Sequence, residues 1–166
     1  MQNKLLILPM ILLLCGGCDS TGDDRLGKLV SVFAPQRDDL NEAREIIQAL
    51  ADTEGISELL VGALYTHNPD RVRYIRDTPF PTRRVTAISL KDPQSKAKLE
   101  RLRAISRKLS CLAVTVEKSG QVRVIMSAGW NSDYGYEFFD RGESQASKHG
   151  DYLEIPGDGN WMAFHG

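Results

Sequence analysis

Two of the three cysteines in this 166-residue chain lie three positions apart, at Cys15 and Cys18. Thiols at this spacing suit thiol–disulfide exchange, zinc binding, or the processing of an exported protein. A redox pair normally opens a helix beside a strand, whereas this pair ends an apolar stretch. A zinc site needs two further ligands at a regular spacing, and Cys111 is the one cysteine that remains. The pair therefore points to export.

The residues before the pair have the layout of a leader peptide. Lys4 precedes an apolar run, Leu5 to Leu14, which is too short to span a bilayer as a helix. Small residues, Gly16 and Gly17, then lead directly to Cys18. We therefore expect residues 1–17 to be a signal peptide.

This arrangement of small residues before a cysteine resembles the lipobox of bacterial lipoproteins. The resemblance is confined to the leader and Asp19. It implies cleavage after Gly17, a lipid with palmitate-type acyl chains on Cys18, and attachment to the periplasmic face of a bacterial membrane. Asp19 is typical of lipoproteins that stay in the inner membrane. Secretion without a lipid is the alternative.

The rest of the chain has the length of one domain. We expect an acidic tether over residues 18–26 and a single domain over residues 27–166. With Cys18 lipidated, Cys111 has no partner for an intrachain disulfide. It stands at the start of an apolar run, so we expect a buried thiol rather than a nucleophile.

Hydrophobic periodicity predicts two clear helices, over residues 38–52 and 92–110, with Asp39 and Asp92 as their N-caps. Residues 56–66 fit a helix and a buried strand about equally well. Alternating or β-rich segments predict strands at 28–34, 71–77, 83–90, 111–117, 121–130, 133–140, 151–155 and 160–164. The later strands follow one another as hairpins. We therefore predict an α+β fold, a mainly antiparallel sheet with two or three helices on one face.

Charge is unevenly distributed along the chain. The net formal charge is −6 over residues 18–58, +9 over residues 59–123 and −5 over residues 124–166. The basic middle could meet an acidic protein, anionic lipid or nucleic acid, or could simply pair with the acidic thirds. Export and the lack of base-recognition motifs argue against nucleic acid.

Aromatic residues gather near the end of the chain, around the stretch GWNSDYGYEFF. A loop of this composition places aromatic anchors beside carboxylates, as binding surfaces often do. The alternative is packing in the sheet. The predicted protein-binding residues are Trp130, Asp133, Tyr134, Tyr136 and Glu137.

Catalytic signatures are missing from the sequence. It has no G-x-S-x-G, no H-E-x-x-H and no glycine-rich phosphate loop, and its three histidines are far apart. Paired carboxylates among Asp133, Glu137 and Asp140 would suit glycoside hydrolysis, but carboxylates are common. We expect no metal and no cofactor.

These observations favour a membrane-anchored protein-binding lipoprotein over an enzyme. Its concrete form would be an immunity-type inhibitor of a secreted toxin or an envelope hydrolase. An enzyme acting on cell-envelope glycans and a structural or assembly lipoprotein are the alternatives.

Overall fold

The computed structural model describes residues 22–61, 71–74, 90–117, 119–128, 132–140 and 151–166. The helices of this part of the chain are α1 (Gly22–Val32), α2 (Arg37–Glu54) and α3 (Pro93–Leu109), with a 3-10 turn, η1 (Ala34–Gln36), after α1. The strands are β1 (Ile56–Leu60), β2 (Arg71–Tyr74), β3 (Ala113–Val116), β4 (Val122–Ala128), β5 (Asp133–Phe138), β6 (Asp151–Glu154) and β7 (Trp161–His165).

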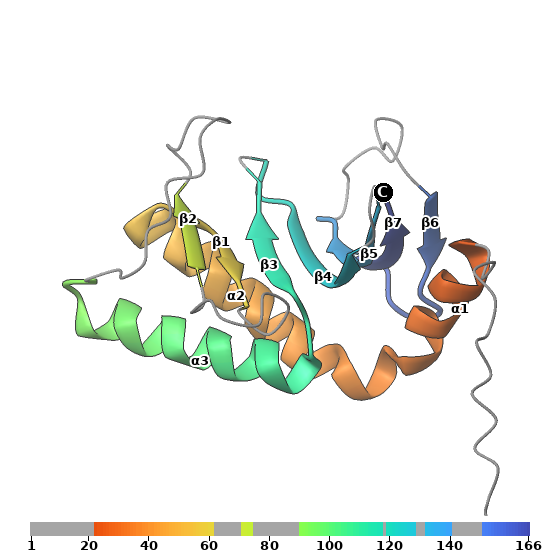
Figure 1. The fold of residues 1–166 in the computed structure, drawn as a ribbon, viewed down its shortest axis with the longest axis horizontal. Helices are drawn as coiled ribbons and strands as arrows, with labels where there is room; N and C mark the ends of the chain where they lie inside the picture. Colours follow the sequence, from red (N-terminus) through yellow and green to blue (C-terminus); the bar gives the residue numbers. More distant parts are fainter. Residues whose placement is uncertain (1–21, 62–70, 75–89, 118, 129–131, 141–150) are drawn as a thin grey trace, which may run out of the picture.

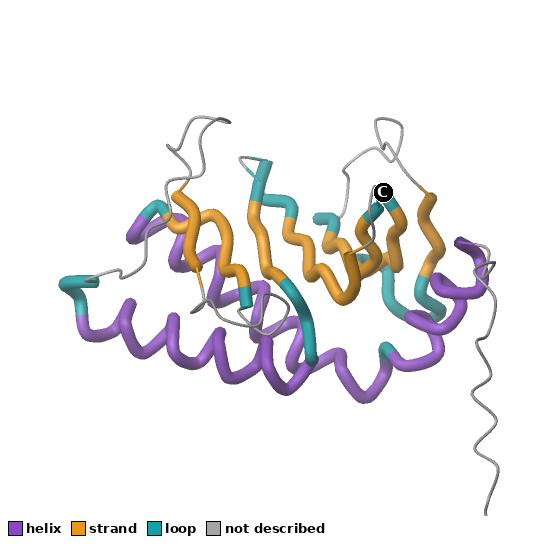
Figure 2. The backbone as a smooth tube through the Cα atoms, viewed as in Figure 1, coloured by secondary structure: helices purple, strands orange, loops and turns teal. Residues whose placement is uncertain are grey.

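The strands form one sheet in the order β2-β1-β3-β4-β5-β7-β6, and every neighbouring pair is antiparallel. The helices lie along one side of this sheet (Figures 1 and 2). Helix α2 packs on β1 and β3, α3 packs beside α2, and α1 covers β5, β6 and β7. This arrangement confirms the predicted α+β class, the antiparallel sheet and the helices on one face.

The core lies between the helices and the inward row of the sheet. One residue of each strand contributes to that row in continuous register: Val72, Leu59, Val114, Val124, Tyr136, Ala163 and Leu153. All of them except Leu153 are buried. Because side chains alternate along a strand, the residues on either side of this row point away from the helices.

The first element differs from the prediction. Residues 28–34 were expected to form a strand and residues 18–26 a tether, but α1 begins at Gly22 and runs to Val32. The apolar residues Leu26, Leu29, Val30 and Phe33 follow the i, i+3, i+4, i+7 spacing of a helical face, and Leu26 and Phe33 are buried. β-Branched residues at 30 and 32 suggested a strand, but burial of the helical face decides the structure.

Helix α2 confirms the second predicted element, although its start differs. Its N-cap is Gln36 and no side chain makes a capping bond, so Asp39 is not the cap. Asp39 instead lies within the first turn and pairs with Lys108 of α3, with Nζ and Oδ2 2.7 Å apart. Gly55 ends the helix in the left-handed conformation, with φ of 71°.

The ambiguous stretch 56–66 forms strand β1 over its first five residues. The segment predicted as a strand at 71–77 is a strand at Arg71–Tyr74. The predicted strand at 83–90 lies outside the described residues except for Leu90. The hairpins β3–β4 and β6–β7 form as predicted.

Helix α3 confirms its predicted cap. The Asp92 carboxylate accepts a hydrogen bond from the Ser95 amide at 2.7 Å, and this bond lowers the pKa of Asp92. The predicted apolar face of α3 is buried, at Leu99, Leu102, Ile105 and Leu109. None of the helices in the described ranges has the length and hydropathy of a membrane span.

Part of the basic middle of the chain pairs with the acidic first third. Arg101 of α3 donates two hydrogen bonds to Glu42 of α2, at 2.6 and 2.7 Å, and Lys108 pairs with Asp39. The Arg101 guanidinium lowers the pKa of Glu42. These pairs lie on the surface, so each adds little to the free energy of unfolding. They mainly favour the observed packing of α3 against α2.

We expect Ile105→Val to lower the free energy of unfolding by about 1 kcal/mol, because it removes one buried methyl group from the α3 face. Urea unfolding followed by circular dichroism measures this. The control is Ala104→Ser on the exposed side of the same helix, which should change stability by less than about 0.5 kcal/mol. Equal effects of the two substitutions would contradict the helix phase.

Candidate functional site

The structure separates the five predicted binding residues. Trp130 and the lipidation candidate Cys18 lie outside the described residues. Asp133 is half-buried at the start of β5, and Tyr134 is 8% exposed. Tyr136 and Glu137 have no exposed surface. Burial thus corrects the predicted surface role of Tyr136 and Glu137, because neither side chain can touch a partner.

Tyr136 belongs to the helical side of the sheet. Its hydroxyl donates a hydrogen bond to the Leu29 carbonyl of α1 at 2.8 Å, and its ring packs edge-on against Phe33. Burial raises the pKa of Tyr136 to about 12. Tyr136 therefore holds α1 against the sheet. Packing, the alternative to a binding role, is what the structure shows for this residue.

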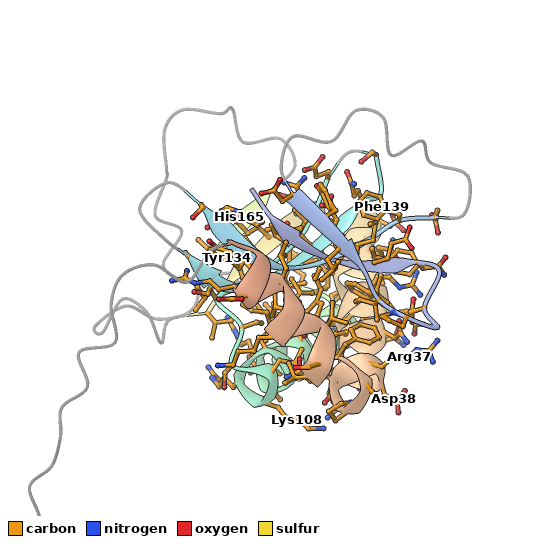
Figure 3. The ribbon with its side chains drawn as sticks, turned by 90° about the vertical axis from the view of Figure 1, so that its right-hand side faces the viewer. Arg37, Asp38, Lys108, Tyr134, Phe139 and His165 are labelled. Carbon is orange, nitrogen blue, oxygen red and sulfur yellow. The ribbon has the colours of Figure 1, made fainter. Side chains whose placement is uncertain are left out.

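Tyr134 lies at the other end of α1, in a stack of rings. His165 of β7 lies parallel to it with ring centroids 4.3 Å apart, and the Arg25 guanidinium lies 4.8 Å from the Tyr134 centroid. Asp151 of β6 is 3.5 Å from Nδ1 of His165. Figure 3 shows Tyr134 and His165 together beside one end of α1, with Arg37 beyond its other end. The contacts join α1 to three strands.

Glu137 points to the opposite side of the sheet, where none of the described helices lies and which we call the helix-free face. A row of mostly charged residues crosses six of the strands there, from β1 to β6, with one residue per strand in continuous register. In sheet order this charged row is Glu58, Thr115, Arg123, Glu137, Met162 and Glu154. Charged residues in the centre of a sheet are costly unless they are paired or serve a binding function.

Three residues of the helix-free face form a charged cluster: Arg123, Glu137 and Tyr152. Nε of Arg123 lies 3.0 Å from Oε1 of Glu137, as a close ion pair whose angle misses hydrogen-bond geometry. The Tyr152 hydroxyl reaches across β7 and donates a hydrogen bond to Oε2 of Glu137 at 2.7 Å. Arg123 also lies 3.6 Å from the Glu117 carboxylate and 5.5 Å from the Phe164 ring centroid.

Two members of the cluster, Arg123 and Tyr152, keep their protonation states at neutral pH. Burial lowers the pKa of Arg123, but the carboxylates of Glu137 and Glu117 more than offset it, so the pKa ends above its ordinary value. Burial raises the pKa of Tyr152, and its hydrogen bond to Glu137 raises it further. Arg123 is therefore charged and Tyr152 neutral, and neither suits proton transfer at physiological pH.

The geometry of Asp133 and Glu137 does not fit the paired carboxylates of a glycoside hydrolase. Asp133 and Glu137 lie four residues apart on one strand, so their Cα atoms are roughly 13 Å apart. Retaining and inverting glycosidases place their carboxyl groups about 5–10 Å apart on either side of the sugar. Glu137 is also fully buried, with one oxygen beside Arg123 and the other bonded to Tyr152.

Sequence reasoning missed Arg123 and Tyr152. The alternation of Val122 and Val124 places Arg123 on the outward face, so part of the signal was available. The rest required the register of two hairpins, which places Arg123 directly opposite Glu137 and brings Tyr152 to it across β7.

No group of three or more potential metal ligands occurs among the described residues. Comparisons of the chain with protein-family models, with curated proteins and with solved structures returned no match.

The Cys111 thiol is buried as predicted, and burial raises its pKa to about 11. The folded state therefore holds the proton more tightly than the unfolded chain, whose thiol has a pKa near 9.0. This contribution to stability is complete below pH 9 and is lost as the pH rises towards 11. We expect the free energy of unfolding to fall by roughly 2–3 kcal/mol across that window because of this thiol.

Urea unfolding at pH 8 and pH 11 measures the effect. The control is Cys111→Ala, which has no thiol to ionise and should lose correspondingly less stability between the two pH values. Wild-type protein and Cys111→Ala losing the same amount would show that the thiol is accessible.

Proposed function

We propose that this chain is an exported, lipid-anchored domain that binds a protein through the helix-free face of its sheet. The charged row of this face, in which Arg123 and Glu154 are accessible, is the observation that carries the proposal. Three helices cover one face with apolar contacts, whereas the other face carries charged side chains in a defined register, of which Glu137 is buried and Arg123 and Glu154 reach the surface. Such a face suits recognition of another charged surface.

The charged cluster supports this proposal by giving the face a rigid centre. Arg123 is partly exposed, with 35% of its side-chain surface accessible, and the accessible carboxylates of Glu117 and Glu154 lie on the same face. Among the described residues of this face, these two accessible carboxylates flank the guanidinium of Arg123 and give an acidic balance. A partner with a basic surface is therefore favoured, and its association should weaken with salt.

An immunity-type inhibitor of a secreted toxin or an envelope hydrolase is the form of binder that we propose. An inhibitor acts by occupying a surface and needs no catalytic group of its own. This agrees with a cluster in which Arg123 and Glu137 form an ion pair and Tyr152 donates a hydrogen bond to Glu137. We place the protein on the periplasmic side of a bacterial membrane, in the inner membrane because of Asp19.

Affinity capture from envelope extract tests the binding proposal. The bait is the purified chain, and the variant Glu117→Lys/Glu154→Lys reverses both accessible carboxylates of the helix-free face. The matched control is Glu45→Lys/Asp52→Lys, which reverses two exposed carboxylates of α2. The proposal predicts one protein that is retained by wild type and control, released by salt, and lost with the first variant. A partner lost only with the α2 variant would refute the assigned face.

Cys18→Ala tests the anchor. We expect the wild-type chain to incorporate a fatty-acid label and to stay with membranes after a carbonate wash, and the variant to lose both properties. Two acyl chains give stable attachment, whereas a domain without them has no comparable hold. Cys15→Ala is the control and should keep the label. Wild-type protein that takes up no label would contradict lipidation.

A further inference from the structure

The start of α1 restricts how an anchored domain can stand on its membrane. The sequence predicted a tether over residues 18–26, which would let the domain move far from the lipid. In the structure α1 begins at Gly22, so three residues separate it from Cys18. A fully extended chain spans at most about 3.6 Å per residue, which limits the Cα atoms of Cys18 and Gly22 to roughly 14 Å apart.

Helix α1 is itself fastened to the domain and does not lengthen this tether. Leu26 and Phe33 are each 3% exposed, and the Leu29 carbonyl accepts the hydrogen bond from Tyr136. At the beginning of the helix, the Arg25 guanidinium lies over Tyr134. The whole domain must therefore follow the position of the first turn of α1.

From this short connection we infer that the end of the domain around the first turn of α1 faces the lipid headgroups. This inference rests on the proposed lipidation of Cys18. The membrane-facing end is defined by Asp24, Arg25, Tyr134, Asp151 and His165, which α1, β5, β6 and β7 bring together. Helix α3 begins at the opposite end of the long axis of the molecule (Figure 1).

Charge does not produce this orientation. Among the described residues that define this end, the exposed carboxylates of Asp24 and Asp151 offset the guanidinium of Arg25, so these residues carry no excess of positive charge to attract anionic lipid. Covalent reach is therefore the cause, and the orientation should not depend on lipid charge. The strands follow one another along the long axis (Figure 1), so the helix-free face extends away from the membrane-facing end.

Fluorescence quenching on the full-length, processed protein tests the orientation. A fluorophore is attached at Asp24→Cys or, as the matched distant position, at Lys96→Cys in the first turns of α3; both sites are exposed, and the buried Cys111 does not compete. The protein is placed in phosphatidylcholine vesicles that carry a nitroxide on the lipid headgroup. We expect the label at position 24 to lose most of its emission and the label at position 96 to keep it.

A third protein combines Asp24→Cys with ten Gly/Ser residues inserted between Ser20 and Thr21. The longer flexible connection has a mean span of about 20 Å, so the emission at position 24 should recover. Mass spectrometry of each protein first establishes the lipid on Cys18. A lipidated protein with equal quenching at positions 24 and 96, or with none at 24, overturns the orientation alone. A protein without lipid overturns the anchor and the orientation together.

Discussion

Gly135→Ala should lower the free energy of unfolding by about 3 kcal/mol, the upper end of the usual cost of overpacking, because the new methyl group has no space in the sheet. Gly135 is in the middle of β5, beside the irregularity in β4 between Ile125 and Ser127. A Cβ atom built at this position would lie 2.0 Å from the Val124 carbonyl oxygen and 3.0 Å from the Ile125 Cα. Both obstacles are backbone atoms, so no rotation of a side chain relieves the overlap.

The Gly135→Ala substitution should disturb the charged cluster as well as lower stability. Strands β4 and β5 carry Arg123 and Glu137 at opposed positions, so a displacement of β5 also separates this ion pair. Thermal and urea unfolding measure the loss, and a lower yield of folded protein would accompany it. The matched control is Gly27→Ala in α1, where nothing lies within 4 Å of the new Cβ. There the substitution should stabilise the helix by up to about 1 kcal/mol. A Gly135→Ala protein as stable as wild type would refute the close approach of β4 and β5.

Arg123→Leu is the second substitution with a large expected effect, about 3 kcal/mol of lost stability at neutral pH. It leaves the Glu137 carboxylate at 0% exposure with the Tyr152 hydroxyl and without its ion-pair partner. Removing one partner of a buried pair usually costs about 3–5 kcal/mol because the other charge stays uncompensated. We expect the lower end of that range, since Arg123 keeps 35% of its side-chain surface exposed and water can enter where it stood.

A double-mutant cycle separates the buried charge from the lost packing on Phe164. Glu137→Gln keeps an acceptor for Tyr152 and removes the charge, so Arg123→Leu/Glu137→Gln should regain part of the stability lost by Arg123→Leu alone. The matched control is Arg101→Leu, which breaks the exposed pair with Glu42 and should change stability little. If the double variant is no more stable than Arg123→Leu, packing rather than charge accounts for the loss.

The sequence by itself determined the elements whose signals are local. The Asp92 cap, Pro93 and the spacing of Leu99, Leu102 and Ile105 defined α3, because a helix is closed by contacts between residues three and four apart. The β3–β4 hairpin followed in the same way from two apolar runs around Ser119-Gly120. Since these elements occur in consecutive order, the α+β class could be predicted as well.

Local sequence signals did not predict the conformation of segments that are buried by residues distant in the sequence. Lys28–Ala34 has the composition of a strand, yet residues 28–32 continue α1, because β5, β6 and β7 offer an apolar surface for one helical face. The first half of the ambiguous stretch 56–66 became strand β1 because β3 was available as a neighbour. A single segment holds no information about the partner that covers it.

The candidate site depended still more on tertiary structure. The sequence identified Glu137 as a carboxylate among aromatics and suggested a surface role. Alternation along β5 sends Tyr136 and Glu137 to opposite faces, and the helices decide that the face of Tyr136 becomes the core. Arg123 and Tyr152 are 14 and 15 residues from Glu137 in sequence, and the strand pairing alone brings them to it. The register of a hairpin is set by its turn together with the pattern of buried residues. The charged row therefore exists only once the whole sheet has formed.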